Sequence, residues 1–252
     1  MSSKDFSFEV PTSLDQIKLS QYQRYVKLVT EHKDDANDEF LKIKLLEIFG
    51  GITNQQALQL AAADVDSIID LILTAINVKE PPLQRRFTMT DPSGKKVEFG
   101  FIPNLERISL GEFIDAEAYV GDWEQMHKAM AVLYRPLTGH KGEFYEIEPY
   151  ESSEKYSEIM LDAPASIAIG VMVFFYHLGM TLHSVTLHSL VQQLKEESKD
   201  LPQAKMPSSK SGDGINHYTH LLEGMYSELA KLQNELYTNA FSGWNLKKKK
   251  VS

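Results

Sequence analysis

One pattern of residues occurs twice in this chain, and it restricts the possible folds more than any other feature. Each copy opens with an aliphatic residue and a proline, Val10-Pro11 in the first and Ile102-Pro103 in the second. The apolar residues that follow have the same spacing, at Leu14, Ile17, Leu19 and Tyr22 and again at Leu105, Ile108, Leu110 and Phe113. A proline, a polar turn and apolar residues at helical intervals are typical of a capped amphipathic helix. We therefore interpret the two copies as a repeated helical unit.

A second helix follows the first in each copy and supports this interpretation. Its apolar positions are Leu41, Leu45, Ile48 and Phe49 in the first copy and Met126, Met130, Leu133 and Tyr134 in the second. The connection between the two helices has to be shorter in the second copy. We place the copies at residues 10–78 and 102–197.

A β-hairpin is predicted between the copies. Residues 86–89 and 97–101 alternate in character, as strands do when one face is buried. The segment Asp91–Gly94, with the sequence Asp-Pro-Ser-Gly, lies between them and favours a tight reversal of the chain.

The sequence as a whole predicts a mainly α fold: a duplicated helical unit with a small β-hairpin between the copies and a C-terminal helical appendage. The expected divisions are the first helical repeat (1–80), the β-hairpin with the second helical repeat (81–197), a flexible linker (198–214) and a C-terminal helix with a basic tail (215–252). The linker is assigned from its content of Pro, Ser, Gly and Lys, which is typical of segments without a packed core.

Composition excludes several classes of protein. The chain has no cysteine, so it forms no disulfide, thiolate metal site or cysteine nucleophile. Its net charge of −9 disfavours a general nucleic-acid binder. The first ten residues lack the basic start and apolar core of a signal peptide, and the most apolar run, 167–178, is shorter than the ~20 residues of a membrane span. We therefore expect a soluble, intracellular protein that does not enter a membrane.

The histidines do not predict a metal site. His177, His183 and His188 belong to one apolar helix, but they lack the i, i+4 spacing that brings two imidazoles to one metal. His217 and His220 could share a helix face, but no acidic pair accompanies them. We therefore expect packing or surface histidines and no bound metal.

The glycine-rich and acidic segments do not predict a catalytic or cofactor-binding site either. Residues 212–214 follow Lys210 and precede a helix, but Ile215-Asn216 stands where a phosphate-binding loop needs Lys and Ser or Thr. Neighbouring acids occur at Asp34-Asp35, Asp64 and Asp66, Glu146 and Glu148, and Glu196-Glu197. A hydrolytic acid pair needs a cleft that holds the two carboxyl groups apart, which nothing in the sequence indicates. We expect a protein without enzymatic activity.

Two groups of residues are candidates for binding a partner protein. Trp123, Tyr134 and Arg135 lie around the second helix of the second copy, and aromatic residues and arginine often anchor interfaces. Near the C-terminus, Trp244 precedes a run of four lysines, Lys247, Lys248, Lys249 and Lys250. Core packing explains the first group equally well, and a solubilising tail explains the lysines.

Several segments resemble a poorly characterised family of tailed-bacteriophage proteins. The strongest likeness is in Phe101–Leu105, Leu110–Asp115 and His127–Pro136. Further likeness is in Val10–Leu14, Leu19–Tyr22 and Ala163-Pro164 leading into Val173–Tyr176. The resemblance covers most of the chain to about residue 190, and none of these segments is a catalytic signature.

The resemblance implies a non-enzymatic role in virion assembly, in one of two forms. A tail assembly chaperone coats the tape-measure protein and recruits tail-tube subunits in the host cytoplasm. A neck or connector ring protein lies between portal and tail in the virion and forms a homo-oligomer. The acidic charge and the separate C-terminal module favour the chaperone. A third alternative is a small phage-encoded metal-dependent enzyme, which would lose activity with a chelator and with His217→Ala.

Overall fold

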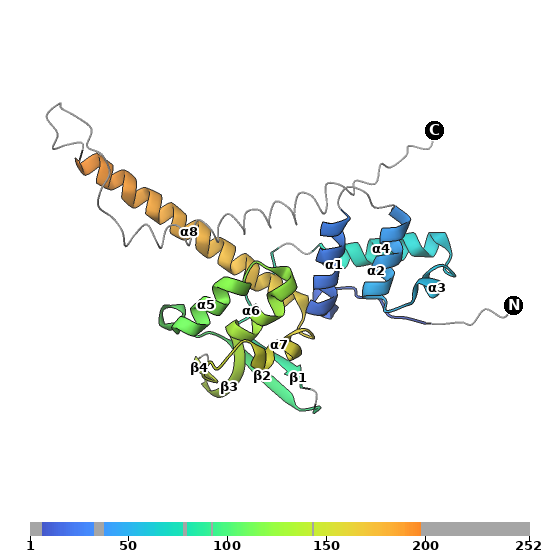
Figure 1. The fold of residues 1–252 in the computed structure, drawn as a ribbon, viewed down its shortest axis with the longest axis horizontal. Coiled ribbons are helices and arrows are strands. Elements are labelled where there is room, and N and C mark those ends of the chain that lie inside the picture. The colour runs from blue at the N-terminus through green and yellow to red at the C-terminus, as the bar shows by residue number, and fades with distance from the viewer. Residues whose placement is uncertain (1–6, 33–37, 78–79, 92, 143, 198–252) are drawn as a thin grey trace. The chain divides into compact units, whose positions relative to one another are not determined.

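The computed structural model describes residues 7–32, 38–77, 80–91, 93–142 and 144–197, apart from the side chains of residues 141 and 182–197 (Figure 1). The chain divides into two compact units, Met1–Val171 and Met172–Ser252. The α-helices of the described residues are α1 (Leu19–Glu31), α2 (Asp38–Phe49), α3 (Asn54–Ala57), α4 (Ala62–Ile76), α5 (Leu110–Tyr119), α6 (Met126–Leu133), α7 (Glu154–Met160) and α8 (Ala165–Glu197). The strands are β1 (Arg86–Thr90), β2 (Lys96–Phe101), β3 (Tyr134–Lys141) and β4 (Phe144–Ile147), and three short 3₁₀ helices are η1 (Leu14–Gln16), η2 (Leu105–Arg107) and η3 (Trp123–Gln125).

The first part of unit 1 is helical and packs through the apolar stripes that the sequence shows. Tyr25 of α1 is buried, and its ring centroid lies 5.8 Å from that of Phe49 at the end of α2. Helix α4 buries Ile69 and Ile72 on its inner face. Burial of each such side chain contributes about 1.5–3 kcal/mol to the free energy of unfolding. Helix α2 ends before Gly51, which has the left-handed φ of 64° that glycine adopts without strain.

The predicted hairpin is confirmed. Strands β1 and β2 pair antiparallel, with Arg86 opposite Gly100 and Thr90 opposite Lys96. In the turn, the Asp91 carboxylate accepts a hydrogen bond of 2.9 Å from the amide of Ser93. The prediction succeeds because the turn chemistry and the strand pattern are both local.

The fold class predicted from the sequence is wrong, because the hairpin is only half of a sheet. Strand β3 pairs antiparallel with β2 and β4 pairs with β3, which gives one four-stranded sheet in the order β1-β2-β3-β4. The fold is therefore mixed α and β rather than mainly α (Figure 1). Tyr134 was predicted to belong to the second helix of the second copy, but it lies in β3, as does Pro136. Pro136, which has no amide hydrogen, is opposite Phe99 of β2.

The two matching segments adopt the same local structures in the same register. η1 and η2 begin at Leu14 and Leu105, and α1 and α5 begin at Leu19 and Leu110. The residue before each α-helix is extended, with φ and ψ of −71° and 149° at Lys18 and of −70° and 159° at Ser109. The second helices also correspond. The matching apolar residues of α2 recur with the same spacing in the second copy, where they lie in α6 and at the start of β3.

The correspondence between the copies is shorter than the predicted ranges 10–78 and 102–197. After α2 the first copy continues with two more helices, α3 and α4, while after α6 the second copy continues with β3 and β4. The remaining predicted divisions, 198–214 and 215–252, lie outside the described residues. Among the residues that the structure describes, none of the helices combines the length and apolar character needed to cross a membrane.

Helix α8 begins in the core of unit 1 and contains two glycines with contrasting surroundings. A Cβ atom at Gly170 would lie 2.7 Å from the carbonyl oxygen of Pro82, which is backbone and cannot move aside easily. We expect Gly170→Ala to lower the free energy of unfolding by about 1–3 kcal/mol. A Cβ atom at Gly179 would have no described atom within 4 Å.

Gly179→Ala is the matched control, because it makes the same change in the same helix without the contact. Alanine favours the helix by roughly 0.5–1 kcal/mol over glycine, so this variant should be at least as stable as the wild type. Thermal unfolding of both variants measures the difference. A Gly170→Ala variant as stable as Gly179→Ala would show that the Pro82 contact does not constrain α8.

Candidate partner-binding surface

Helix α5 begins with two reciprocal hydrogen bonds between Ser109 and Glu112. The amide of Ser109 donates to Glu112 Oε2 at 2.7 Å, and the amide of Glu112 donates to Ser109 Oγ at 3.3 Å. This arrangement is a capping box, in which two amides that lack helical partners are satisfied by side chains. It fixes the residue at which the helix starts and the direction of its faces.

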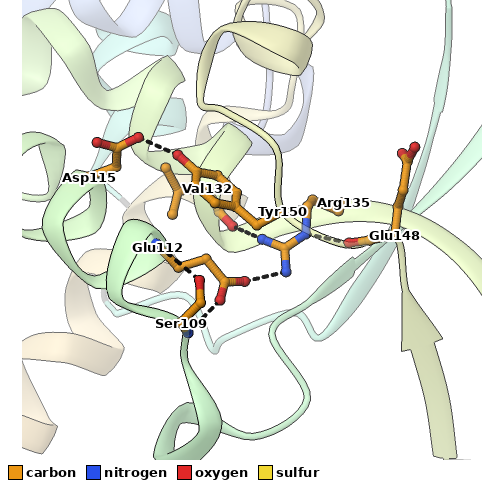
Figure 2. Close-up of polar contacts among 7 residues, drawn as sticks. All are labelled: Ser109, Glu112, Asp115, Val132, Arg135, Glu148 and Tyr150. Atoms are coloured by element: carbon orange, nitrogen blue, oxygen red, sulfur yellow. Dashed lines mark hydrogen bonds and ion pairs between the residues drawn. The ribbon is translucent and has the colours of Figure 1, made fainter.

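A buried arginine holds this helix against the rest of the unit (Figure 2). Arg135 is at the start of β3, and its guanidinium forms an ion pair with Glu112 of α5. It also donates to two backbone oxygens, from Nη1 to Val132 at 2.8 Å and from Nε to Glu148 at 2.7 Å. One side chain therefore joins α5, the end of α6 and the segment after β4.

The charges of this pair are balanced within the fold. Burial alone would raise the pKa of Glu112, but the hydrogen bonds from Ser109 and the charge of Arg135 outweigh it, and the pKa lies below its usual value. Both partners are almost inaccessible, at 7% exposure for Arg135 and 8% for Glu112. The pair is thus ionised, buried and fully engaged with protein groups, which is typical of a structural ion pair.

Tyr150 covers the guanidinium and makes a second contact with α5. Its ring centroid lies 5.4 Å from the central carbon of the Arg135 guanidinium, and its hydroxyl donates to the Asp115 carboxylate (Figure 2). Burial, and then the hydrogen bond to Asp115, raise the pKa of Tyr150 above its usual value. The phenol therefore remains a hydrogen-bond donor at neutral pH.

Glu148 anchors the other side of the cluster. Its carboxylate forms an ion pair with Lys155 at 2.7 Å and accepts a hydrogen bond from the Tyr156 hydroxyl. The hydrogen bonds from Lys155 and Tyr156 lower the pKa of Glu148. Burial and the same contact raise the pKa of Tyr156 to about 12. The carboxylate of Glu148 is engaged like that of Glu112.

The first copy performs the same task with a neutral residue. Gln21 corresponds to Glu112, and its Oε1 accepts from the amide of Lys18 at 3.0 Å. Its Nε2 then donates directly to the carbonyl of Ile48 at 2.9 Å, near the end of α2. A glutamate cannot donate, so in the second copy Arg135 supplies the hydrogen for the end of α6. This comparison identifies the Glu112–Arg135 pair as a structural link between α5 and the end of α6.

Helix α5 departs in two ways from the burial pattern of an ordinary surface helix. The inner face carries Glu112, which is buried, and Asp115, which binds Tyr150. The outer face carries Leu110 and Ile114, which are 74% and 53% exposed. Buried polar groups and exposed large aliphatic groups are the two departures from ordinary burial that carry information, and here they occur in one helix. We call Leu110 and Ile114 the outer face of α5.

The residues predicted to bind a partner are placed differently. Trp123, Tyr134 and Arg135 are all buried, with whole-residue exposures of 6%, 0% and 6%. Trp123 packs against Tyr22 of α1, with ring centroids 4.9 Å apart. Their role in partner binding stays a prediction, and the structure places all three inside unit 1. Trp244 and the lysines Lys247, Lys248, Lys249 and Lys250 lie outside the described residues.

Most of the candidate catalytic groups are on the surface or engaged in ion pairs. Asp66 pairs with Lys42, and His177 is exposed on α8. Glu146 and Glu148 lie on or next to β4, where Glu148 binds Lys155. Within the described ranges, no three His, Asp or Glu side chains gather as a metal site would require. His183, His188, His217, His220 and residues 210–216 lie outside the described side chains.

Sequence reasoning missed the outer face of α5. Leu110 and Ile114 have i, i+4 spacing, but Phe113, Ala116 and Tyr119 form a second apolar set on another side of the same helix. Periodicity shows two apolar faces and does not tell which one is buried. The spacing of Ser109 and Glu112 could have indicated the orientation of the helix, because a capping box fixes the side on which Glu112 lies.

Comparisons with protein-family models, with curated proteins and with solved structures returned no match.

Proposed function

We propose that this protein is a non-enzymatic assembly factor of a tailed bacteriophage that binds other phage structural proteins through the outer face of α5. The observation that carries the proposal is the unusual burial pattern of this helix. Leu110 and Ile114 are exposed, although the same helix buries a carboxylate that needs a charge partner. An exposed aliphatic pair on a rigidly held helix is a typical docking site for a protein partner.

The rigidity of the helix supports this use of the surface. Two polar contacts hold α5 on its inner side, the pair with Arg135 and the Asp115–Tyr150 hydrogen bond, and the capping box fixes where the helix begins. A binding face on a helix held in this way loses little conformational entropy when a partner is bound. The resemblance to tailed-phage proteins includes Leu110–Asp115, the segment that carries this face.

We place the protein as a tail assembly chaperone rather than as a ring subunit. A chaperone has to present apolar surface to newly made tape-measure or tail-tube protein, and the net charge of −9 keeps such a protein soluble. One observation favours the connector as an alternative: β1 and β4 are the two edges of the sheet, and an edge strand can pair with a neighbouring subunit.

Quantitative mass spectrometry of purified particles and of tail assembly intermediates tests the proposal. We expect the protein in intermediates together with tape-measure or tail-tube protein, and its absence from finished particles. The double variant Leu110→Asp/Ile114→Asp should lose these partners by about tenfold or more, because each aspartate replaces an aliphatic contact by a charge. Leu71→Asp is the control, since Leu71 is also exposed, at 52%, but lies on α4.

Stoichiometric presence in finished particles would replace the chaperone by the connector. Equal recovery of partners by the α5 variant and by Leu71→Asp would show that α5 is not the docking surface. No association with any phage structural protein would overturn the proposed function.

A further inference from the structure

The first copy shows what kind of segment fits against the start of its helix. The turn Leu161–Ala165, which joins α7 to α8, lies against Ile17–Ser20 and forms an antiparallel β-bridge between Lys18 and Pro164. The amides of Leu19 and Ser20 donate to the carbonyls of Ala163 and Leu161 at 2.7 and 2.9 Å.

The same stretch closes the contact with one more backbone bond and an ion pair. The amide of Ala165 donates to the carbonyl of Ile17 at 2.8 Å. Lys18 Nζ lies 2.7 Å from Asp162. Leu19, whose amide takes part in this contact, is completely buried, at 0% exposure.

Among the residues that the structure describes, the second copy presents the corresponding surface without an equivalent cover. Ile108, Ser109, Leu110 and Gly111 correspond to Ile17, Lys18, Leu19 and Ser20. Ile108 is extended, with φ of −59° and ψ of 135°, as Ile17 is with −89° and 124°. The difference is in burial: Leu19 is 0% exposed, while Leu110 is 74% exposed.

We infer that the start of α5 binds a proline-containing turn of another protein, built like Leu161–Ala165. The segment would add a short antiparallel pairing to residues 108–111, with an aliphatic or small side chain over Leu110 and Ile114. This mode is a local form of strand addition, in which backbone bonds give affinity and side-chain positions give selectivity. The inference rests on the proposed function and names the chemistry of the partner.

The charges beside the start of α5 favour a neutral or basic partner segment and disfavour a second copy of this chain. In the first copy Asp162 faces Lys18, but Ser109 stands at the position of Lys18. Glu106, Arg107 and Glu117 are exposed along this stretch, which leaves one net negative charge. An acid at the position of Asp162 would therefore be repelled, and a neutral or basic residue is favoured. The stretch Leu161–Ala165 of a second copy carries that acid and is already held by its own α1.

Titration of the isotope-labelled full chain with two synthetic peptides tests this inference. One peptide has the sequence of residues 159–167, and the other carries Asp162→Lys. We expect the lysine peptide to shift the amide resonances of residues 108–114 and to bind about two- to fivefold more tightly than the aspartate peptide, as an exposed charge contact allows. Leu110→Asp/Ile114→Asp should abolish these shifts, and Leu71→Asp should keep them.

Three results would overturn the inference. The first is no shift at residues 108–114 with millimolar lysine peptide. The second is shifts confined to Ile17–Ser20, which would mean that the peptide only displaces the native stretch. The third is equal affinity for the two peptides. Capture of whole partner proteins is a separate experiment. If the α5 variant loses its partners but neither peptide shifts a resonance, this segment chemistry is rejected and the proposed function stands. Leu110→Ser/Ile114→Ser repeats the test if the aspartate variant is unfolded.

Discussion

Arg135→Met is expected to lower the free energy of unfolding by about 3–5 kcal/mol, one of the two largest losses for a single substitution in this protein. The variant keeps much of the side-chain volume but removes the cation beside Glu112. That carboxylate is 8% exposed and would remain buried without its partner. The carbonyls of Val132 and Glu148 would also lose their donors. Urea unfolding followed by circular dichroism measures the loss.

A second variant separates the cost of the unpaired charge from the loss of packing. Arg135→Met/Glu112→Gln removes both charges, and Gln21 shows that a glutamine at this position can bond to the end of the following helix. We expect the double variant to recover at least half of the stability lost by Arg135→Met, because no charge is left buried. If the double variant were less stable than Arg135→Met by the full cost of a second independent substitution, the ion pair would not be the structural link described above.

The pH dependence gives an independent check with a definite sign. In the wild type the pKa of Glu112 is lowered, so its contribution to stability is present at neutral pH and is lost as the pH falls through the folded-state pKa. In Arg135→Met, burial without the cation raises that pKa, and protonation relieves the unpaired charge. The stability difference between wild type and variant should therefore shrink between neutral pH and about pH 4. A difference that grows on acidification would contradict this account.

The parts of the fold that follow from local chemistry are predictable from this sequence, and the sheet shows where prediction ends. The hairpin is readable because Asp91–Gly94 favours a turn between two strand-like segments. Strand β3 cannot be read from the sequence, because Met126–Tyr134 continues a helical pattern up to the residue where the strand begins. What makes β3 a strand is its pairing with β2, with Tyr134 opposite Phe101. Such a contact between distant segments overrides local preference.

The candidate surface shows the same division between local and tertiary information. Ser109 is predictable as the residue before a helix, and the structure confirms that it caps α5. The exposure of Leu110 is not predictable, since its counterpart Leu19 has the same surroundings in sequence and is completely buried. The amide of Leu19 is bonded to the carbonyl of Ala163, which lies far away in the sequence. Pattern analysis does not reach contacts of this kind.

Tyr134→Ala is expected to lower the free energy of unfolding by about 3–5 kcal/mol. The side chain is completely buried where α6 passes into β3, with ring centroids 5.1 Å from Phe87 and 5.3 Å from Phe101. Its hydroxyl donates to the carbonyl of Gln84 at 2.6 Å. Burial raises the pKa of Tyr134, so the hydroxyl stays a donor at neutral pH. Alanine would leave a cavity at the junction of helix and sheet.

Two further variants show which part of Tyr134 matters. Tyr134→Phe keeps the ring and should cost only about 1 kcal/mol, because water can reach the exposed Gln84 and replace the hydrogen bond. Phe144→Ala is the control for removing an aromatic ring of the same sheet. Phe144 is 86% exposed at the start of β4, so its loss should change stability by less than about 0.5 kcal/mol. Equal losses for Tyr134→Ala and Phe144→Ala would mean that the core is not centred on Tyr134, and the pairing of β3 with β2 would have to be revised.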